Sequence, residues 1–228
     1  MKINVIATGS AGNLYEVVDV AGNSILIEAG YSIEMYMKHR VGVIPPECLI
    51  VSHKHTDHYS FALNWSAFTD VHVEPEKVET KSWKVMGFDV EHGGCPCKAF
   101  IIKSLVENII FLFATDLMYD DAKIKDLEQI CSYLELENFV IECNYNDYLY
   151  HLAKAEQRIG CDRHFSDNDV VRFVRNTEAK KAKIITIHGS HRLCSDSYTK
   201  RYLGGKLPTA TIAVAVGATK SSKNVFII

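Results

Sequence analysis

The chain has 228 residues, of which 47% are hydrophobic and 10% aromatic, and its formal net charge is only −3. This composition indicates one globular unit with a substantial core, so we expect a single domain over residues 1–228. No segment approaches the roughly 18 apolar residues of a membrane span, and the N-terminus lacks a signal-peptide pattern. We therefore expect a cytoplasmic protein that does not bind membranes.

The cysteines exclude a secreted disulfide framework. They are odd in number and scattered along the chain: Cys48, Cys95, Cys97, Cys131, Cys143, Cys161 and Cys194. Most should be reduced and buried. The Cys95-x-Cys97 pair lies close to His92, but it lacks the second pair that a closed zinc site would need, so it is a weak metal signal.

The N-terminal part of the chain predicts short strands joined by turns. Strand patterns cover residues 2–8, 14–20 and 24–28, which predicts an antiparallel β-meander. The loop of residues 9–13 is rich in glycine but lacks the lysine and the spacing of a P-loop, so a structural turn is the better interpretation. A helix is expected over residues 32–40, followed by a buried strand over 48–52.

A dense set of potential metal ligands follows that buried strand. In an extended segment alternate side chains share a face, so His53, His55 and Asp57 can converge while a turn brings in His58. Imidazole suits Zn, Mn or Fe, and a mixed His/Asp set is typical of catalytic metal sites. A surface histidine cluster is the alternative, but compatible ligands recur downstream, which favours a metal site.

The remaining strands and helices deliver further ligand-type residues. We expect strands over residues 82–85, 88–91, 99–103, 108–114, 139–142, 183–187, 210–216 and 224–228, and helices over 147–157 and 167–176. The unbroken apolar run before Asp116 predicts a strand that is covered on both faces. His92, Asp116 and His188 each follow a strand end, which is where binding residues concentrate.

Charge is distributed unevenly along the chain. Residues 158–228 hold 13 Lys/Arg and 5 Asp/Glu, a balance of +8, whereas the balance over residues 1–157 is −11. This asymmetry indicates either a polyanion-binding surface or a solvated helix face, and the sequence favours neither. The contributing residues are Arg172, Arg175, Lys180, Lys181, Lys183, Arg192, Lys200 and Arg201.

The ordered series His53-x-His55-x-Asp57-His58, then His92, Asp116 and His188, resembles that of the metallo-β-lactamase-fold hydrolase superfamily. The resemblance implies an α+β fold, a four-layer αββα sandwich, with two divalent metal ions, most simply Zn or Mn. It assigns one metal to His53, His55 and His92, a second to Asp57, His58 and His188, and a bridging position to Asp116. Asp57 would also orient the attacking hydroxide, which gives it a catalytic role.

The last ligand remains open among His164, His188 and His191. We favour His188, because it emerges directly from a strand and because His188-Gly189-Ser190 resembles a His-x-Ser element of one branch of the superfamily. His164 would then lie near the site without binding metal. His191 is a candidate for substrate binding or leaving-group protonation, although a solvated loop histidine explains it equally well.

That branch consists of small phosphodiesterase and exonuclease-like proteins. Further points of similarity are the loop of residues 9–13 and the segment Glu142-Cys143-Asn144-Tyr145. The resemblance implies a metal-dependent hydrolase. We expect it to cleave DNA or RNA through a metal-activated hydroxide, with the basic C-terminal third contacting the phosphates. Two alternatives stay open: a hydrolase of lactones, thioesters or cyclic nucleotides, and a non-catalytic binding module that retains the metal.

Overall fold

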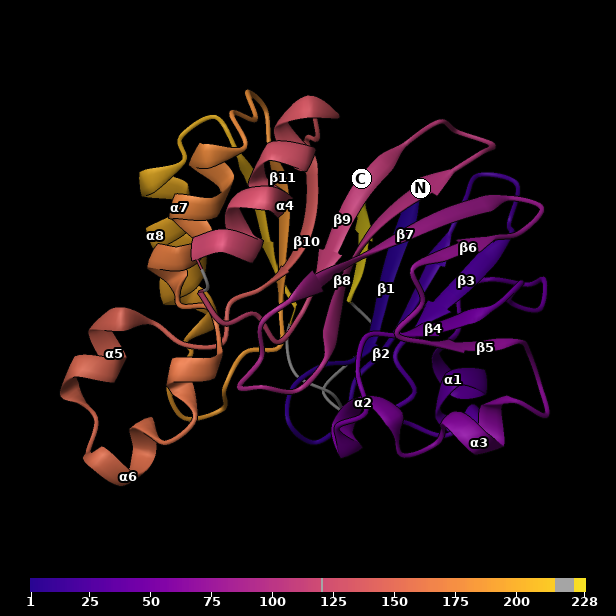
Figure 1. Cartoon of the computed structure of the whole chain (residues 1–228), viewed down its shortest axis with the longest axis horizontal. Coiled ribbons are helices and arrows are strands. Elements are labelled where there is room, and N and C mark those ends of the chain that lie inside the picture. Colours follow the sequence, from indigo (N-terminus) through magenta and orange to yellow (C-terminus); the bar gives the residue numbers. More distant parts are fainter. Residues whose placement is uncertain (120, 216–223) are drawn as a thin grey trace. The chain divides into compact units, whose positions relative to one another are not determined.

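The computed structural model describes residues 1–119, 121–215 and 224–228 (Figure 1). The described chain divides into two compact units. Unit 1 comprises Met1–Gly87, Phe100–Ile110 and residues 224–228, and unit 2 comprises Phe88–Ala99 and Phe111–Ala215. Two strands, β7 (Trp83–Val90) and β8 (Cys97–Ser104), pass from one unit into the other.

Unit 1 contains a six-stranded mixed sheet with the order β13-β1-β2-β3-β4-β5. Its strands are β1 (Lys2–Ala7), β2 (Leu14–Val18), β3 (Ser24–Ile27), β4 (Leu49–Val51), β5 (Val71–Val73) and β13 (Val225–Ile227). The first three strands are antiparallel, which confirms the predicted meander, and β3, β4 and β5 are parallel. A short strand, β6 (Lys77–Glu79), pairs with β7.

Three helices of unit 1 accompany this sheet: α1 (Ile33–His39), α2 (Thr56–Tyr59) and α3 (Ala62–Trp65). Helix α1 begins where predicted, because the Ser32 side chain accepts a hydrogen bond from the Met35 amide. One apolar core joins α1 and α3 to the sheet, with Tyr36 and Trp65 in edge-to-face contact at 5.6 Å between ring centroids. The core therefore holds α1 and α3 against the strands that lead to the His53–His58 segment.

Unit 2 is built on a parallel ladder that runs β9-β10-β11-β12. The strands are β9 (Ile110–Ala114), β10 (Asn138–Glu142), β11 (Lys183–Ile187) and β12 (Thr211–Val214). The helices are α4 (Asp121–Tyr133), α5 (Asp147–Leu152), α6 (Ala155–Arg158), α7 (Asp167–Asn176) and α8 (Asp196–Lys206), and a 3₁₀ turn spans Cys161–Arg163. Residues 111–114 of β9 are all buried, as their unbroken apolar run predicted.

The structure corrects several predicted boundaries. The two strands expected over residues 82–85 and 88–91 form one strand, β7, which continues through Gly87. The single helix expected over residues 147–157 is two helices, because the backbone is extended at Ala153 and Lys154. Helices α2, α3, α4 and α8 and strands β5 and β6 were not predicted, and Val216 of the last but one predicted strand lies outside the described residues.

The predicted α+β class is confirmed, since each unit combines a sheet with helices. All seven cysteines are free thiols, and five of them are buried. Of the described helices, none is both long enough and apolar enough to cross a membrane.

Candidate metal centre

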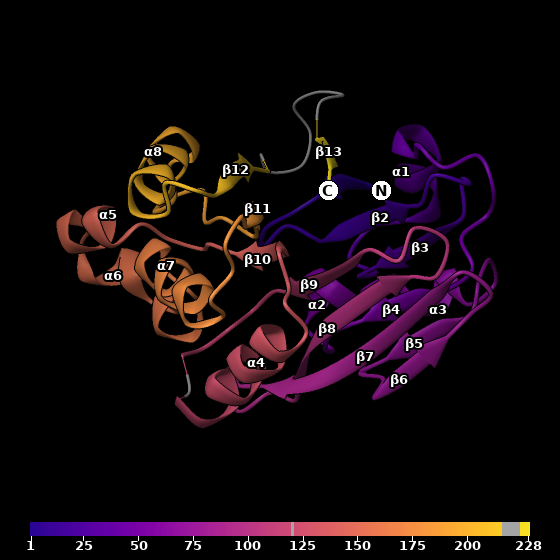
Figure 2. The same ribbon diagram turned by 90° about the horizontal axis from the view of Figure 1, so that it is seen from above.

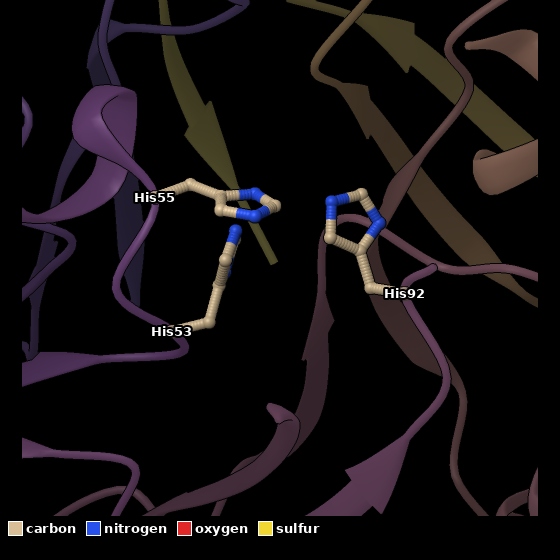
Figure 3. Close-up of side chains that lie close together, drawn as sticks. All are labelled: His53, His55 and His92. Atoms are coloured by element: carbon tan, nitrogen blue, oxygen red, sulfur yellow. The ribbon is translucent and has the colours of Figure 1, made fainter. Parts of the chain in front are cut away.

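In unit 1, His53, His55 and His58 gather around the end of β4. The His53 ring lies edge-on to the His55 ring at 4.6 Å between centroids, as Figure 3 shows, and 4.3 Å from the ring of His58. His55 caps helix α2, so Asp57 already lies in a helical turn rather than in the extended segment that was predicted. The short helix, and not strand alternation, therefore brings His58 back beside His53.

The glycine-rich loop before β2 holds this segment in place. The Asn13 amide donates to the Asp57 carbonyl at 2.7 Å, and the Asn13 side chain reaches the Asp57 carboxylate at 3.3 Å. Gly30 passes so close to the segment that a Cβ on it would lie 1.9 Å from the Asp57 carbonyl oxygen. The interpretation of this loop as a structural turn agrees with these contacts, which support the potential ligands.

Carboxylates and hydroxyls orient the histidine rings of unit 1. Nδ1 of the fully buried His58 lies 3.4 Å from the Glu28 carboxylate, and its Nε2 lies 3.2 Å from the Asp57 carboxylate. The Ser52 hydroxyl is 2.9 Å from Nδ1 of His53. Metal-binding histidines in proteins have such partners on the ring nitrogen that faces away from the metal, because these partners fix the tautomer and the ring orientation.

In unit 2, four side chains converge at the carboxyl ends of the parallel strands. One potential ligand atom from each of Asp116, Glu142, His164 and His188 lies within 4.8 Å of the others. Asp116 follows β9, Glu142 ends β10 and His188 follows β11, so parallel neighbours deliver three of them to one edge. We call this set the strand-end cluster.

The backbone is strained where the strand-end cluster forms. Asp116 and His188 both have positive φ angles, 54° and 56°, which non-glycine residues rarely adopt. Glu28, the residue behind His58, shares this feature with a φ of 67° directly after β3. Such strain costs of the order of 1–3 kcal/mol per residue and is concentrated at functional sites. A residue with a left-handed backbone conformation just beyond a strand does not continue the alternation of the strand, so its side chain points in a different direction.

Glu142 holds two histidines of the strand-end cluster. Its Oε1 atom lies 2.6 Å from Nδ1 of His164 and 3.0 Å from Nδ1 of His188, and its Oε2 atom accepts from the Leu117 amide at 2.8 Å. Burial opposes ionisation, but the charge and the hydrogen bond of His164 and the hydrogen bond of His188 keep the pKa of Glu142 below its ordinary value. Burial likewise lowers the pKa of His164, yet Glu142 outweighs it and raises that pKa overall. In both side chains the pairing prevails over burial.

His92 is the other predicted ligand that unit 2 supplies, and it also appears in Figure 3. It lies two residues beyond β7, with Nδ1 3.1 Å from the Arg163 carbonyl and Nε2 3.6 Å from the Asp116 carboxylate. Burial lowers its pKa, which favours the neutral imidazole that binds metal. Because Nδ1 of His92 contacts the Arg163 carbonyl, Nε2 is the ring nitrogen that faces Asp116.

The structure bears on two further histidines of the sequence prediction, His164 and His191. His164 belongs to the same cluster as His188, although it was expected only near the site. His191 is exposed and belongs to none of the potential metal clusters of the described residues, and neither do Cys95 and Cys97. Glu142 belongs to a segment that resembles the family, but the sequence did not predict it as a site residue. Its position at the end of a buried strand, before Cys143-Asn144, was the available signal.

The donors of each unit fit divalent metal ions. They are imidazole nitrogens and carboxylate oxygens without thiolates, a set that suits Zn, Mn or Fe and is typical of catalytic rather than closed structural sites. His53, His58, Asp116, Glu142 and His188 are all buried, so their polar atoms lie where an ion would be shielded from solvent.

Comparisons with known proteins identify the fold. Residues 7–89 match the model of the Metallo-beta-lactamase superfamily. The metallo-beta-lactamase fold protein YhfI from Bacillus subtilis superposes with a TM-score of 0.70 at 14% identity, covering 99% of this chain and 98% of that one. The short form of human tRNase Z gives 0.63 at 13% identity, covering 100% and 99%. Zn²⁺-bound PqqB from Methylobacterium extorquens gives 0.67 at 9% identity, covering 100% of both chains. None of the curated proteins matches the sequence.

Proposed function

We propose that the chain is a metal-dependent hydrolase of the metallo-beta-lactamase superfamily and, more narrowly, a phosphodiesterase that cleaves DNA or RNA. The observation that carries this proposal is the strand-end cluster of Asp116, Glu142, His164 and His188. One structural relative, human tRNase Z, is a nuclease by name, which supports a phosphodiester substrate.

We propose the following ligand assignment for two metal ions, Zn or Mn. His53, His55 and His92 would hold one ion, Asp57, His58 and His188 would hold the second, and Asp116 would serve both. A pair of such ions supplies Lewis acidity and a bound water that loses its proton near neutral pH. Glu142 and Glu28 contribute by fixing the rings of His188 and His58 through Nδ1.

Asp57 is the proposed proton acceptor. Its carboxylate is partly exposed, and Oδ2 is held by the Asn13 side chain at 3.3 Å and by the His58 ring at 3.2 Å. A carboxylate fixed in this way can orient an attacking water and accept its proton. His191 is the proposed contact to the substrate or to the leaving group, since it is exposed three residues beyond His188.

The basic residues of the C-terminal third are the proposed contacts to the phosphate backbone. All eight of the predicted lysines and arginines are exposed. If they neutralise phosphates, affinity for duplex DNA should fall with salt by a log–log slope of about −0.9 per contact. An affinity that does not depend on salt would remove nucleic acid as the substrate.

The test is metal-stimulated cleavage of end-labelled single- and double-stranded DNA and RNA, with Mn and Zn supplied separately. We expect the wild-type chain to cleave at least one of these substrates and the Asp57→Ala variant to lose at least a hundredfold in rate, about the contribution of a positioned base. His151→Ala, which removes an exposed histidine of α5, is the matched control and should retain activity.

Two other outcomes of this experiment would support one of the alternative functions instead. Turnover of a lactone, thioester or cyclic nucleotide without polynucleotide cleavage would indicate a small-molecule hydrolase. Stoichiometric metal binding without turnover of any of these compounds would indicate a binding module.

A further inference from the structure

Three tyrosines of unit 2 form a column of stacked rings. Tyr148 of α5 stacks on Tyr198 of α8 at 5.8 Å between centroids and 18° between planes, and Tyr198 stacks on Tyr202 at 5.8 Å and 10°. Figure 2 shows α5 and α8 at the same end of this unit. We call these three residues the tyrosine column.

The column ends in a ring that faces solvent. Tyr148 is 57% exposed, whereas Tyr198 and Tyr202 are half-buried. Tyr198, Tyr202 and Lys206 are four residues apart on α8 and therefore share one face of the helix. A ring this exposed contributes little to the core of unit 2, so core packing alone does not explain why Tyr148 stacks in the column.

Positive charge lines the column. The Arg201 guanidinium lies 5.7 Å from the centre of the Tyr198 ring, and the Lys206 ammonium lies 5.7 Å from that of Tyr202. Lys200 is also exposed on α8. The Arg201 and Lys206 side chains thus lie beside a continuous aromatic stack.

The acidic residues beside the column are already used inside unit 2. Asp147 accepts hydrogen bonds from Ser166 and Asn168, and Asp167 accepts from Asn146 and from the Asp147 amide. The Tyr202 hydroxyl donates to the Asn168 side chain, which fixes that ring. These bonds order the base of the column, and the positive charge beside its rings comes from Arg201 and Lys206.

We propose that the tyrosine column is a stacking platform for single-stranded nucleic acid. A base stacks on the exposed face of Tyr148 and so extends the column, while Arg201 and Lys206 neutralise backbone phosphates. Every base has an aromatic face, so such a platform tolerates any sequence, and it favours single strands because the bases of a duplex are already stacked. The proposal deepens the proposed function, on which it rests for its substrate class, but the binding it describes requires no hydrolysis.

The experiment measures binding of a fluorescein-labelled single-stranded 12-mer of DNA or RNA in EDTA, so that cleavage does not interfere. Tyr148→Ala should weaken binding about tenfold, the change expected when a stack worth about 1.4 kcal/mol is lost. Tyr148→Phe should bind as the wild type does, because it keeps the ring. Tyr133→Ala is the matched control, since Tyr133 is 87% exposed at the end of α4 and is not part of the tyrosine column.

A second probe separates stacking from charge. An abasic 12-mer has the same phosphates, so it should bind the wild type and Tyr148→Ala equally and more weakly than the base-bearing strand. Arg201→Ala with Lys206→Ala should reduce the salt dependence for both probes. Thermal unfolding of each variant checks that it folds.

The proposal is overturned if a folded Tyr148→Ala binds the 12-mer as tightly as the wild type, if the abasic strand binds as tightly as the base-bearing one, or if neither strand binds. Its failure is distinct from failure of the proposed function. Tyrosine-dependent binding without cleavage in the presence of metal would leave the platform standing and remove the nuclease, whereas cleavage with unaltered Tyr148→Ala binding would do the reverse.

Discussion

The potential metal ligands come from two regions that are built by different means. In unit 1, His53, His55, Asp57 and His58 are neighbours in the sequence and are shaped by one loop, one short helix and the close passage of Gly30. In unit 2, the strand-end cluster draws its residues from positions up to 72 apart and joins two histidines through a single buried carboxylate. The first region depends on local backbone geometry, and the second depends on the register of a parallel sheet.

The largest expected effect comes from breaking the local geometry. Gly30→Ala would place a Cβ 1.9 Å from the Asp57 carbonyl oxygen, so the backbone of the His53–His58 segment must move. We expect a loss of roughly 3 kcal/mol in the free energy of unfolding, together with loss of activity. Chemical denaturation measures the first and substrate cleavage the second.

Gly205→Ala is the control for that substitution. Gly205 lies in α8, and a Cβ there has nothing within 4 Å. Alanine should therefore leave stability unchanged or raise it by up to about 1 kcal/mol. If Gly30→Ala behaves like Gly205→Ala, the local account of the unit 1 ligands is wrong.

The next effect distinguishes the two histidines of the strand-end cluster. Since we assign metal binding to His188, His188→Ala should remove one of the two ions and reduce turnover below detection. His164→Ala should keep both ions with an affinity about tenfold lower, the lower end of the range for an orienting partner. Elemental analysis measures the metal content of each variant. Loss of an ion from His164→Ala but not from His188→Ala would show that His164, and not His188, is the ligand.

A smaller effect, on metal affinity, is expected when either of the two supporting carboxylates, Glu142 or Glu28, is neutralised. Glu142→Gln removes the charge that two histidines share, and it should weaken metal binding by about 10- to 100-fold. Glu28→Gln should cost less, because Glu28 contacts one histidine, at 3.4 Å. Competition with a chelator of known affinity measures both. Equal losses of metal affinity in the two variants would show that contacting two histidines does not make Glu142 more important for metal binding than Glu28.

The smallest effect is expected at His191. It is exposed and outside the clusters, so His191→Ala should lower the turnover rate by roughly tenfold or less, below the range of a well-positioned general acid, and leave the metal content unchanged. A loss of metal in this variant would show that His191, and not His188, completes the ligand set.

The same contrast explains how much of the molecule the sequence could predict. The His53–His58 segment was found because its residues are adjacent, and the strand that precedes Asp116 was found because its residues form an unbroken apolar run. Glu142 was missed as a site residue because its role depends on which strands are neighbours, which a single sequence does not state. Helix α8 was missed because its apolar residues are few, and so the stacking of Tyr148 on Tyr198 was not foreseeable.

The most direct test of the central claim is the number of metal ions that one chain binds. The protein would be stripped with a chelator, reconstituted separately with Zn and Mn, freed of excess metal and analysed by mass spectrometry for metal per chain. We expect two ions per chain for the wild type and fewer for His53→Ala and His188→Ala, as the two-metal assignment requires. A wild-type chain that retains no ion, or that retains the same number as these variants, would contradict it.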